Sequence, residues 1–225
     1  MTDAGEGFQP LPANRKDGEM MKRLLVLISA SVIVAATASA AGASSWETED
    51  IFGQGLGGAT VAIDGAKILR GAGGVTASVT MPTPAPGTYD YPSGPTASGV
   101  EGHPETFSLW VFLFFNPENC AVPGECGPGD LQFDPDVVAG AFNAGGHLAA
   151  GPTLTISGRV NEQNPTFGGA NAETIAQALS MGFDIADAEV HIAVAPHGAL
   201  APELLPLQIK TPAGTPAFWW LAIFN

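Results

Sequence analysis

Glycine and proline divide this chain into short apolar segments, and this feature most constrains how it can fold. The 225 residues include 29 Gly and 19 Pro, which interrupt most runs that could otherwise form a long helix. From Gly57 onwards the intervening segments are rich in β-branched residues, and several alternate apolar with polar positions, as half-buried strands do. We therefore predict a mainly β, single-domain, two-layer β-sandwich or flattened barrel.

The clearest predicted strand covers residues 106–116. Leu109 to Phe115 are all apolar, which indicates a central strand with both faces buried. Within residues 58–69, Asp64-Gly65 is a hairpin-turn dipeptide and predicts a turn between two strands. Alternation near the C-terminus turns Trp219 and Trp220 to opposite faces. Further strands are expected at 74–81, 136–144, 146–160, 188–198, 205–210 and 216–224.

One short helix is expected near residues 172–182. Asn171 is a favourable N-cap, Glu173 lies in the first turn, and Gly182 suits the C-terminal stop. The sequence thus predicts about eight short strands and a single helix.

Residues 21–40 have the order of a secretory signal peptide. Met21-Lys22-Arg23 precedes an uncharged run, LLVLISASVIVAA, and small residues follow as far as Ala40. We predict an upstream extension at 1–20, a signal peptide at 21–40 cleaved near Ala40, a linker at 41–56 and the β domain at 57–225. The protein would then be secreted or held at the cell surface. The alternative is that uncharged residues 24–45, long enough to span a bilayer, remain as an anchor.

The predicted exported part is strongly acidic. The chain has a formal net charge of −14, with 8 Lys or Arg against 22 Asp or Glu; four of each lie in residues 1–40, which leaves four against 18. Such a surface lacks the clustered basic residues that nucleic-acid binding needs. It repels anionic lipid and favours cations and solubility, so we expect no nucleic acid partner, and a membrane only if the leader is retained.

Cys120 and Cys126 are the chain's two cysteines. Export would place them in an oxidising compartment, and Pro123-Gly124 between them allows a tight loop to close. We predict a disulfide that pins this loop, worth about 2–3 kcal/mol by the loop-entropy model.

Two sets of side chains are candidate metal ligands. His191 could bind a divalent cation with His147 or His103 if the fold brought them together; the alternative is a strand histidine paired with Glu189. Three carboxylates, Asp130, Asp134 and Asp136, lie in a Gly/Pro-rich loop and offer the hard oxygen ligands that calcium uses, although without EF-hand spacing. Their alternative is a solvated turn in which they cap backbone groups.

Three segments carry a resemblance. At NPENC (116–120), AEVHIAVAPHG (188–198) and PAFWWLAIF (216–224), the chain resembles a group of uncharacterised exported bacterial proteins with an NPxNC loop and an AEVH…HG strand. The resemblance covers residues 106–225. It implies that Cys120, His191 and His197 belong to a recurrent framework, and it supplies no activity.

Catalytic motifs are sparse in the sequence. It contains no G-x-S-x-G, H-E-x-x-H or P-loop pattern, and no G-x-G-x-x-G that opens a helix after a strand. We therefore expect a secreted, non-enzymatic domain that binds an unknown protein, glycan or surface ligand and uses no cofactor. The alternative is a metal-binding module or metal-dependent enzyme that uses His191 with His147 or His103. A further alternative is self-association through the apolar C-terminal strand.

Overall fold

The computed structural model describes residues 45–55, 57–92, 102–167 and 174–225. The predicted extension and signal peptide, and the proposed cap Asn171, lie outside the described residues. No helix in the described ranges is long and apolar enough to cross a membrane.

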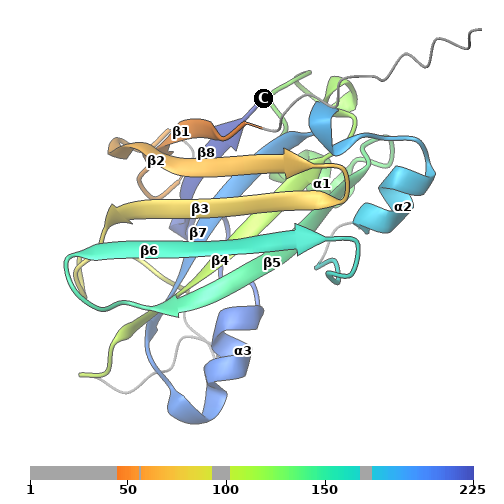
Figure 1. The fold of residues 1–225 in the computed structure, drawn as a ribbon. Coiled ribbons are helices and arrows are strands. Elements are labelled where there is room, and N and C mark those ends of the chain that lie inside the picture. Colours follow the sequence, from red (N-terminus) through yellow and green to blue (C-terminus); the bar gives the residue numbers. More distant parts are fainter. Residues whose placement is uncertain (1–44, 56, 93–101, 168–173) are drawn as a thin grey trace, which may run out of the picture. The chain divides into compact units, whose positions relative to one another are not determined.

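Eight strands form one antiparallel sheet, in the order β5-β4-β7-β8-β1-β2-β3-β6 (Figure 1). The sheet curls until its two edges, β5 and β6, approach each other, giving a nearly closed, flattened barrel. At this seam a Cβ added to Gly158 would lie 1.8 Å from the carbonyl oxygen of Ala144, so only glycine permits the approach. The mainly β prediction is confirmed. The strands are β1 (Glu47–Phe52), β2 (Thr60–Gly71), β3 (Gly74–Pro82), β4 (Glu105–Phe114), β5 (Ala139–Leu148), β6 (Thr153–Asn161), β7 (Glu189–Ala199) and β8 (Trp220–Phe224).

The barrel interior is filled by one face of every strand. In β3 and β6 the predicted alternation is observed, with Val79 opposite Ile156 and Met81 opposite Leu154, all four buried. The intervening Thr and Ser side chains point outward. Tyr89 packs against the interior rings of Phe107 and Trp220. Burial, and then its hydrogen bond to Glu105 (2.6 Å), raises the pKa of the Tyr89 phenol far above its ordinary value.

Strand β4 is buried on both faces, as predicted, and lies between β5 and β7 in the sheet. Leu109, Val111 and Leu113 face the interior. The alternate residues Trp110, Phe112 and Phe114 belong to a second apolar cluster on the outer face. Because a barrel strand needs only one apolar face, other chain segments must cover this second one.

Residues 205–210, predicted as a strand, form helix α3 (Leu205–Lys210) instead. Pro206 lies in the first turn, where its missing N–H costs nothing and its fixed φ suits a helix. Gln208 is buried: its Oε1 accepts from the N–H of Ala201 (2.8 Å), and its Nε2 donates to the carbonyl of Ala199 (3.2 Å). Leu207 is exposed, and Gln208 is the buried residue of this helix, so the segment does not present the single apolar face of a strand.

The predicted turn at Asp64-Gly65 is also wrong, because β2 continues through it. Asp64 adopts a positive φ of 48°, and its N–H donates to Asp50 Oδ1 (3.0 Å). The register between β1 and β2 shifts near this point, between Glu49 and Ile51. The dipeptide thus forms a bulge. It opposes β1, which occupies residues 47–52 of the predicted linker, so that boundary is corrected as well.

The predicted helix is present as α2 (Ile175–Ser180). Thr174 caps it: its Oγ1 accepts from the N–H of Gln177 (3.1 Å), and Gln177 Oε1 accepts from the N–H of Thr174 (3.0 Å). The sequence did not predict α1 (Pro128–Phe133), which follows the cysteine loop. Four single-turn 3-10 segments complete the described elements, at Pro117–Asn119, Ile185–Asp187, Pro202–Leu204 and Pro216–Phe218.

Candidate functional site

An aromatic groove lies on the outer face of β4, β7 and β8. Its volume is about 320 Å³, within the range usual for small-molecule sites. Its floor comes from the strands, one rim from Cys126 to Gln132, and the other from Pro212 to Trp219 with Phe167. The lining residues are Trp110, Phe112, Phe114, Cys126, Gly127, Pro128, Leu131, Gln132, Ala141, Phe167, His191, Pro212, Gly214, Pro216, Trp219, Leu221 and Ile223.

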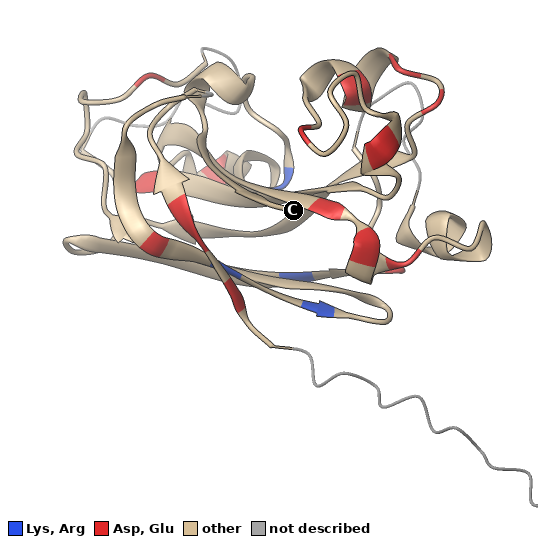
Figure 2. Cartoon of the chain, turned by 90° about the horizontal axis from the view of Figure 1, so that it is seen from above, with Lys and Arg blue, Asp and Glu red and all other residues tan. Residues whose placement is uncertain are grey.

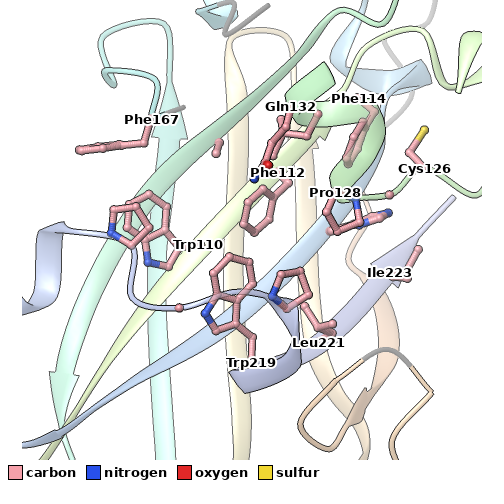
Figure 3. Close-up of a pocket in the computed structure, with 17 residues that line it drawn as sticks. Trp110, Phe112, Phe114, Cys126, Pro128, Gln132, Phe167, Trp219, Leu221 and Ile223 are labelled. Atoms are coloured by element: carbon pink, nitrogen blue, oxygen red, sulfur yellow. The ribbon is translucent and has the colours of Figure 1, made fainter. Parts of the chain in front are cut away.

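Five aromatic rings line the groove and make its walls mainly apolar (Figure 3). Phe112 and Trp219 are stacked at its centre, with ring centroids 5.6 Å apart. Trp110 and Phe167 meet edge-on at one end, 5.2 Å apart, and Phe114 lies toward the other end, near Pro128. The walls therefore present π-systems held by packing against one another.

The position of Trp219 follows from the alternation at the C-terminus. Trp220 points into the barrel, and Trp219, immediately before β8, belongs to the outer cluster, as the predicted opposite faces require. The indole N–H of Trp219 donates to the carbonyl of Ala213 (2.7 Å). Because its one polar atom is bonded within the protein, the ring offers the groove an apolar surface.

The cysteine loop builds the first rim. A disulfide joins Cys120 to Cys126, with a Cα–Cα distance of 5.3 Å, so the predicted bridge is present. Asn116 holds the base of the loop: its Nδ2 donates to the carbonyl of Asp136 (2.9 Å), and its Oδ1 accepts from the N–H of Val138 (2.7 Å). These bonds tie the residue that begins NPENC, just after β4, to the segment that leads into β5.

A buried acid and a histidine lie where this rim meets the floor. Glu189 is 2% exposed, and its Oε1 accepts from the backbone N–H of Cys126 (2.9 Å). The same oxygen lies 2.5 Å from Nε2 of His191, which lines the groove. The disulfide loop thus fixes Glu189, and Glu189 fixes the orientation of the His191 ring. This agrees with the predicted alternative of a strand histidine paired with Glu189.

A second buried polar group lies under Trp110. The indole N–H of Trp110 donates to Ser108 Oγ (2.8 Å), which is also 2.8 Å from Nε2 of His197. Both Ser108 and His197 are fully buried. The network therefore anchors the tryptophan at its end of the groove, and the buried Ser108 is not exposed to a ligand in this arrangement.

The three histidines proposed as metal ligands are not brought together. His191 lies opposite Phe112 on the outer face, whereas His147 lies opposite Phe107 on the interior side. These two β4 positions are five residues apart, about 16 Å along the strand. His103 lies beyond the same end, with Nδ1 3.2 Å from the carbonyl of Leu200. Among the described residues, no three His, Cys, Asp or Glu side chains could share an ion.

Two of the three aspartates proposed for calcium, Asp130 and Asp134, bind backbone groups through their carboxylates. Asp130 is buried: its two carboxylate oxygens accept from the N–H groups of Ala121 (2.8 Å) and Gly127 (2.6 Å). Asp134 Oδ1 accepts from the N–H of Asp136 (2.9 Å). This is the capping role given above as the alternative to a calcium site.

Sequence reasoning did not identify Trp110, Phe112, Phe114 and Trp219 as a site, because aromatic runs are usually core. The signal was nevertheless present. An apolar run over both faces of one strand, in a chain whose strands at 74–82 and 153–161 alternate, implies a second apolar surface outside the barrel.

Comparisons with known proteins return no match: neither a protein-family model, nor a curated protein, nor a solved structure is similar to this chain. The resemblance to uncharacterised exported proteins therefore stays a prediction, and the function must be argued from the groove itself.

Proposed function

We propose that this chain is an exported, non-enzymatic binding protein whose aromatic groove holds a compact, mainly apolar small molecule. The observation that carries the proposal is the composition of the groove: five rings, three prolines and several aliphatic side chains line it, against two polar side chains, Gln132 and His191. Sites with apolar walls and few directed polar groups bind ligands by burial and orient them through those groups.

The polar chemistry of the site supports binding over catalysis. Of the two polar side chains, His191 is already committed to Glu189 through Nε2. Ser108 contacts His197, but it is buried beneath Trp110 and does not face the groove. In the described part of the groove the protein thus offers orientation and burial, and no activated nucleophile faces the ligand.

Export is the second part of the proposal. The Cys120–Cys126 disulfide supports an oxidising compartment, and Met21 to Ala40 has the order of a signal peptide. N-terminal sequencing of the protein recovered outside the producing cell tests this. We expect the exported chain to begin near Ala41; recovery of a membrane-bound chain that retains residues 24–40 would contradict cleavage.

A neutral apolar dye tests the groove. N-phenyl-1-naphthylamine fluoresces more strongly when it leaves water for an apolar site, so titration of the purified protein gives a dissociation constant. We expect saturable binding of one dye per chain. Trp219→Ala removes a central wall and should weaken binding about tenfold or more, as for a buried aromatic contact worth at least about 1.4 kcal/mol.

Phe133→Ala is the matched control. Phe133 belongs to α1, beside the groove-lining residues Leu131 and Gln132, but it is 76% exposed and does not line the groove. Binding should be unchanged in this variant. Loss of binding in Phe133→Ala with retention in a folded Trp219→Ala would place the dye on the exposed helix and contradict the proposal. Circular dichroism establishes that each variant is folded.

A further inference from the structure

We propose that the groove selects organic cations, namely ammonium groups attached to an apolar body. This inference rests on the proposed function, because it names the ligand class of the same groove. It is carried by three observations: the aromatic walls, a buried carboxylate behind His191, and the absence of Lys and Arg from the lining residues.

The first observation concerns the rings. The face of an aromatic ring carries partial negative charge, and a cation within about 6 Å of the ring centre is attracted to it, most strongly by Trp. Phe112 and Trp219 form a stacked pair at the centre of the groove. Phe114 continues this aromatic surface to His191, with centroids 4.9 Å apart. An ammonium group in the groove would therefore have ring faces within reach.

The second observation is the electrostatic state of Glu189. Its Oε1 has two partners, the N–H of Cys126 and the ring of His191. Its Oε2 is buried and has no hydrogen-bond partner among the described residues. Burying an incompletely paired carboxylate is costly. A positive charge next to His191 would offset that cost, whereas a neutral ligand would leave it in place.

The tautomer that this pair implies also favours a cation. When Nε2–H donates to Glu189, the other ring nitrogen of a neutral imidazole, Nδ1, is an acceptor. A protonated amine that reached Nδ1 would therefore find an acceptor as well as a negative potential. Quaternary ammonium groups have no N–H to donate, so they would be attracted by the aromatic rings and the negative potential of Glu189 alone.

The third observation is the distribution of charge (Figure 2). Lys67 and Arg70 lie in β2 and Arg159 in β6, and Arg70 is paired with Glu47 (2.9 Å). Lys210 ends α3. The whole chain has a net charge of −14, which raises the local concentration of cations and repels anions. A fatty acid or phosphate in the groove would meet no Lys or Arg among the lining residues and would lie close to Glu189.

The test compares two molecules of the same shape that differ in charge. Phenyltrimethylammonium and its neutral isostere tert-butylbenzene are each titrated against the dye bound to the purified protein. The comparison is demanding, because the neutral molecule leaves water more readily. We expect the cation to displace half of the dye at a concentration at least about tenfold lower than the concentration of tert-butylbenzene that does so.

Two variants assign the preference to the groove. Glu189→Gln removes the charge but keeps an acceptor for Cys126 and His191, and should abolish the preference for the cation. Ile223 pairs with His191 across β7 and β8, lines the groove and is partly exposed. Ile223→Lys should therefore weaken binding of the cation about tenfold more than binding of the neutral isostere. Ile223→Met is the uncharged control of similar reach.

Failure of this inference is distinguishable from failure of the proposed function. If the dye binds in the groove but tert-butylbenzene competes as well as the cation, or neither competes, the cation inference is overturned and the apolar site remains. A preference for the cation that survives both Glu189→Gln and Ile223→Lys also overturns it. If the dye itself does not bind, the proposed function fails first.

Discussion

Two parts of the barrel wall share one interior but differ on their outer faces. On β3 and β6 the outer face carries hydroxyl side chains, such as Thr80 and Thr155, whose Oγ1 atoms are 3.3 Å apart. On β4, β7 and β8 the outer face carries Trp110, Phe112 and Leu221, which are buried. The outer face of β3 and β6 faces water, whereas the outer face of β4, β7 and β8 is covered by the cysteine loop, α1 and residues 212–219.

The difference shows how a groove can arise from a simple barrel. A strand needs one apolar face to build the interior, so a second apolar face creates surface that must be covered. The covering segments here are loops and single helical turns, which do not pack as continuously as another sheet would. The groove is the space that these covering segments leave between Pro128 and Pro212. The contacts that hold the cysteine loop in place also orient Glu189 and His191.

The interior should tolerate truncation least. Phe142 is fully buried among the residues inside the barrel, and Phe142→Ala would leave a cavity that neighbouring strands fill only partly. We expect the free energy of unfolding to fall by about 3–5 kcal/mol, measured by urea denaturation. A loss below about 1 kcal/mol would mean that the interior is not a tightly packed core, and the contrast between interior and outer cover would collapse.

Removal of the disulfide should affect the covered side most. For Cys120→Ser combined with Cys126→Ser we expect a loss of about 2–3 kcal/mol in the free energy of unfolding and weaker dye binding, because the N–H of Cys126 helps to hold Glu189. Hydrogen exchange should show a larger loss of protection in residues 117–138 than in β3 and β6, because local opening of the cover adds there to the loss of global stability. An equal loss of protection in both regions would show that the cover and the hydroxyl face are one cooperative unit.

Substitution on the hydroxyl face should have the smallest effect. Thr155→Val keeps the β-branched shape and removes one exposed hydroxyl that contacts Thr80. We expect the unfolding free energy to change by no more than about 0.5 kcal/mol and dye binding to stay the same. A larger loss, or a change in affinity, would indicate that this face also has a specific role.

Sequence patterns predicted the elements where a single principle acts. Alternation identified β3 and β6, the apolar run at Leu109 to Phe115 identified β4, and the cysteine spacing identified the disulfide. Patterns failed where two principles compete. Residues 205–210 were expected to form a strand, but Pro206 and the buried Gln208 suit a helix packed on the barrel. At Asp64-Gly65 turn propensity was overridden by the pairing of β2 with β1 on both sides of the dipeptide, which became a bulge.

The sequence by itself determined the β class, the disulfide, the acidic charge and the opposite facing of Trp219 and Trp220, because each depends on local periodicity, spacing or composition. Only the tertiary structure decided that the barrel is nearly closed, that the histidines stay apart and that five rings converge on one groove. Those features depend on register and on loops that join residues more than 50 positions apart, such as Cys126 and Glu189. No local pattern encodes such distances.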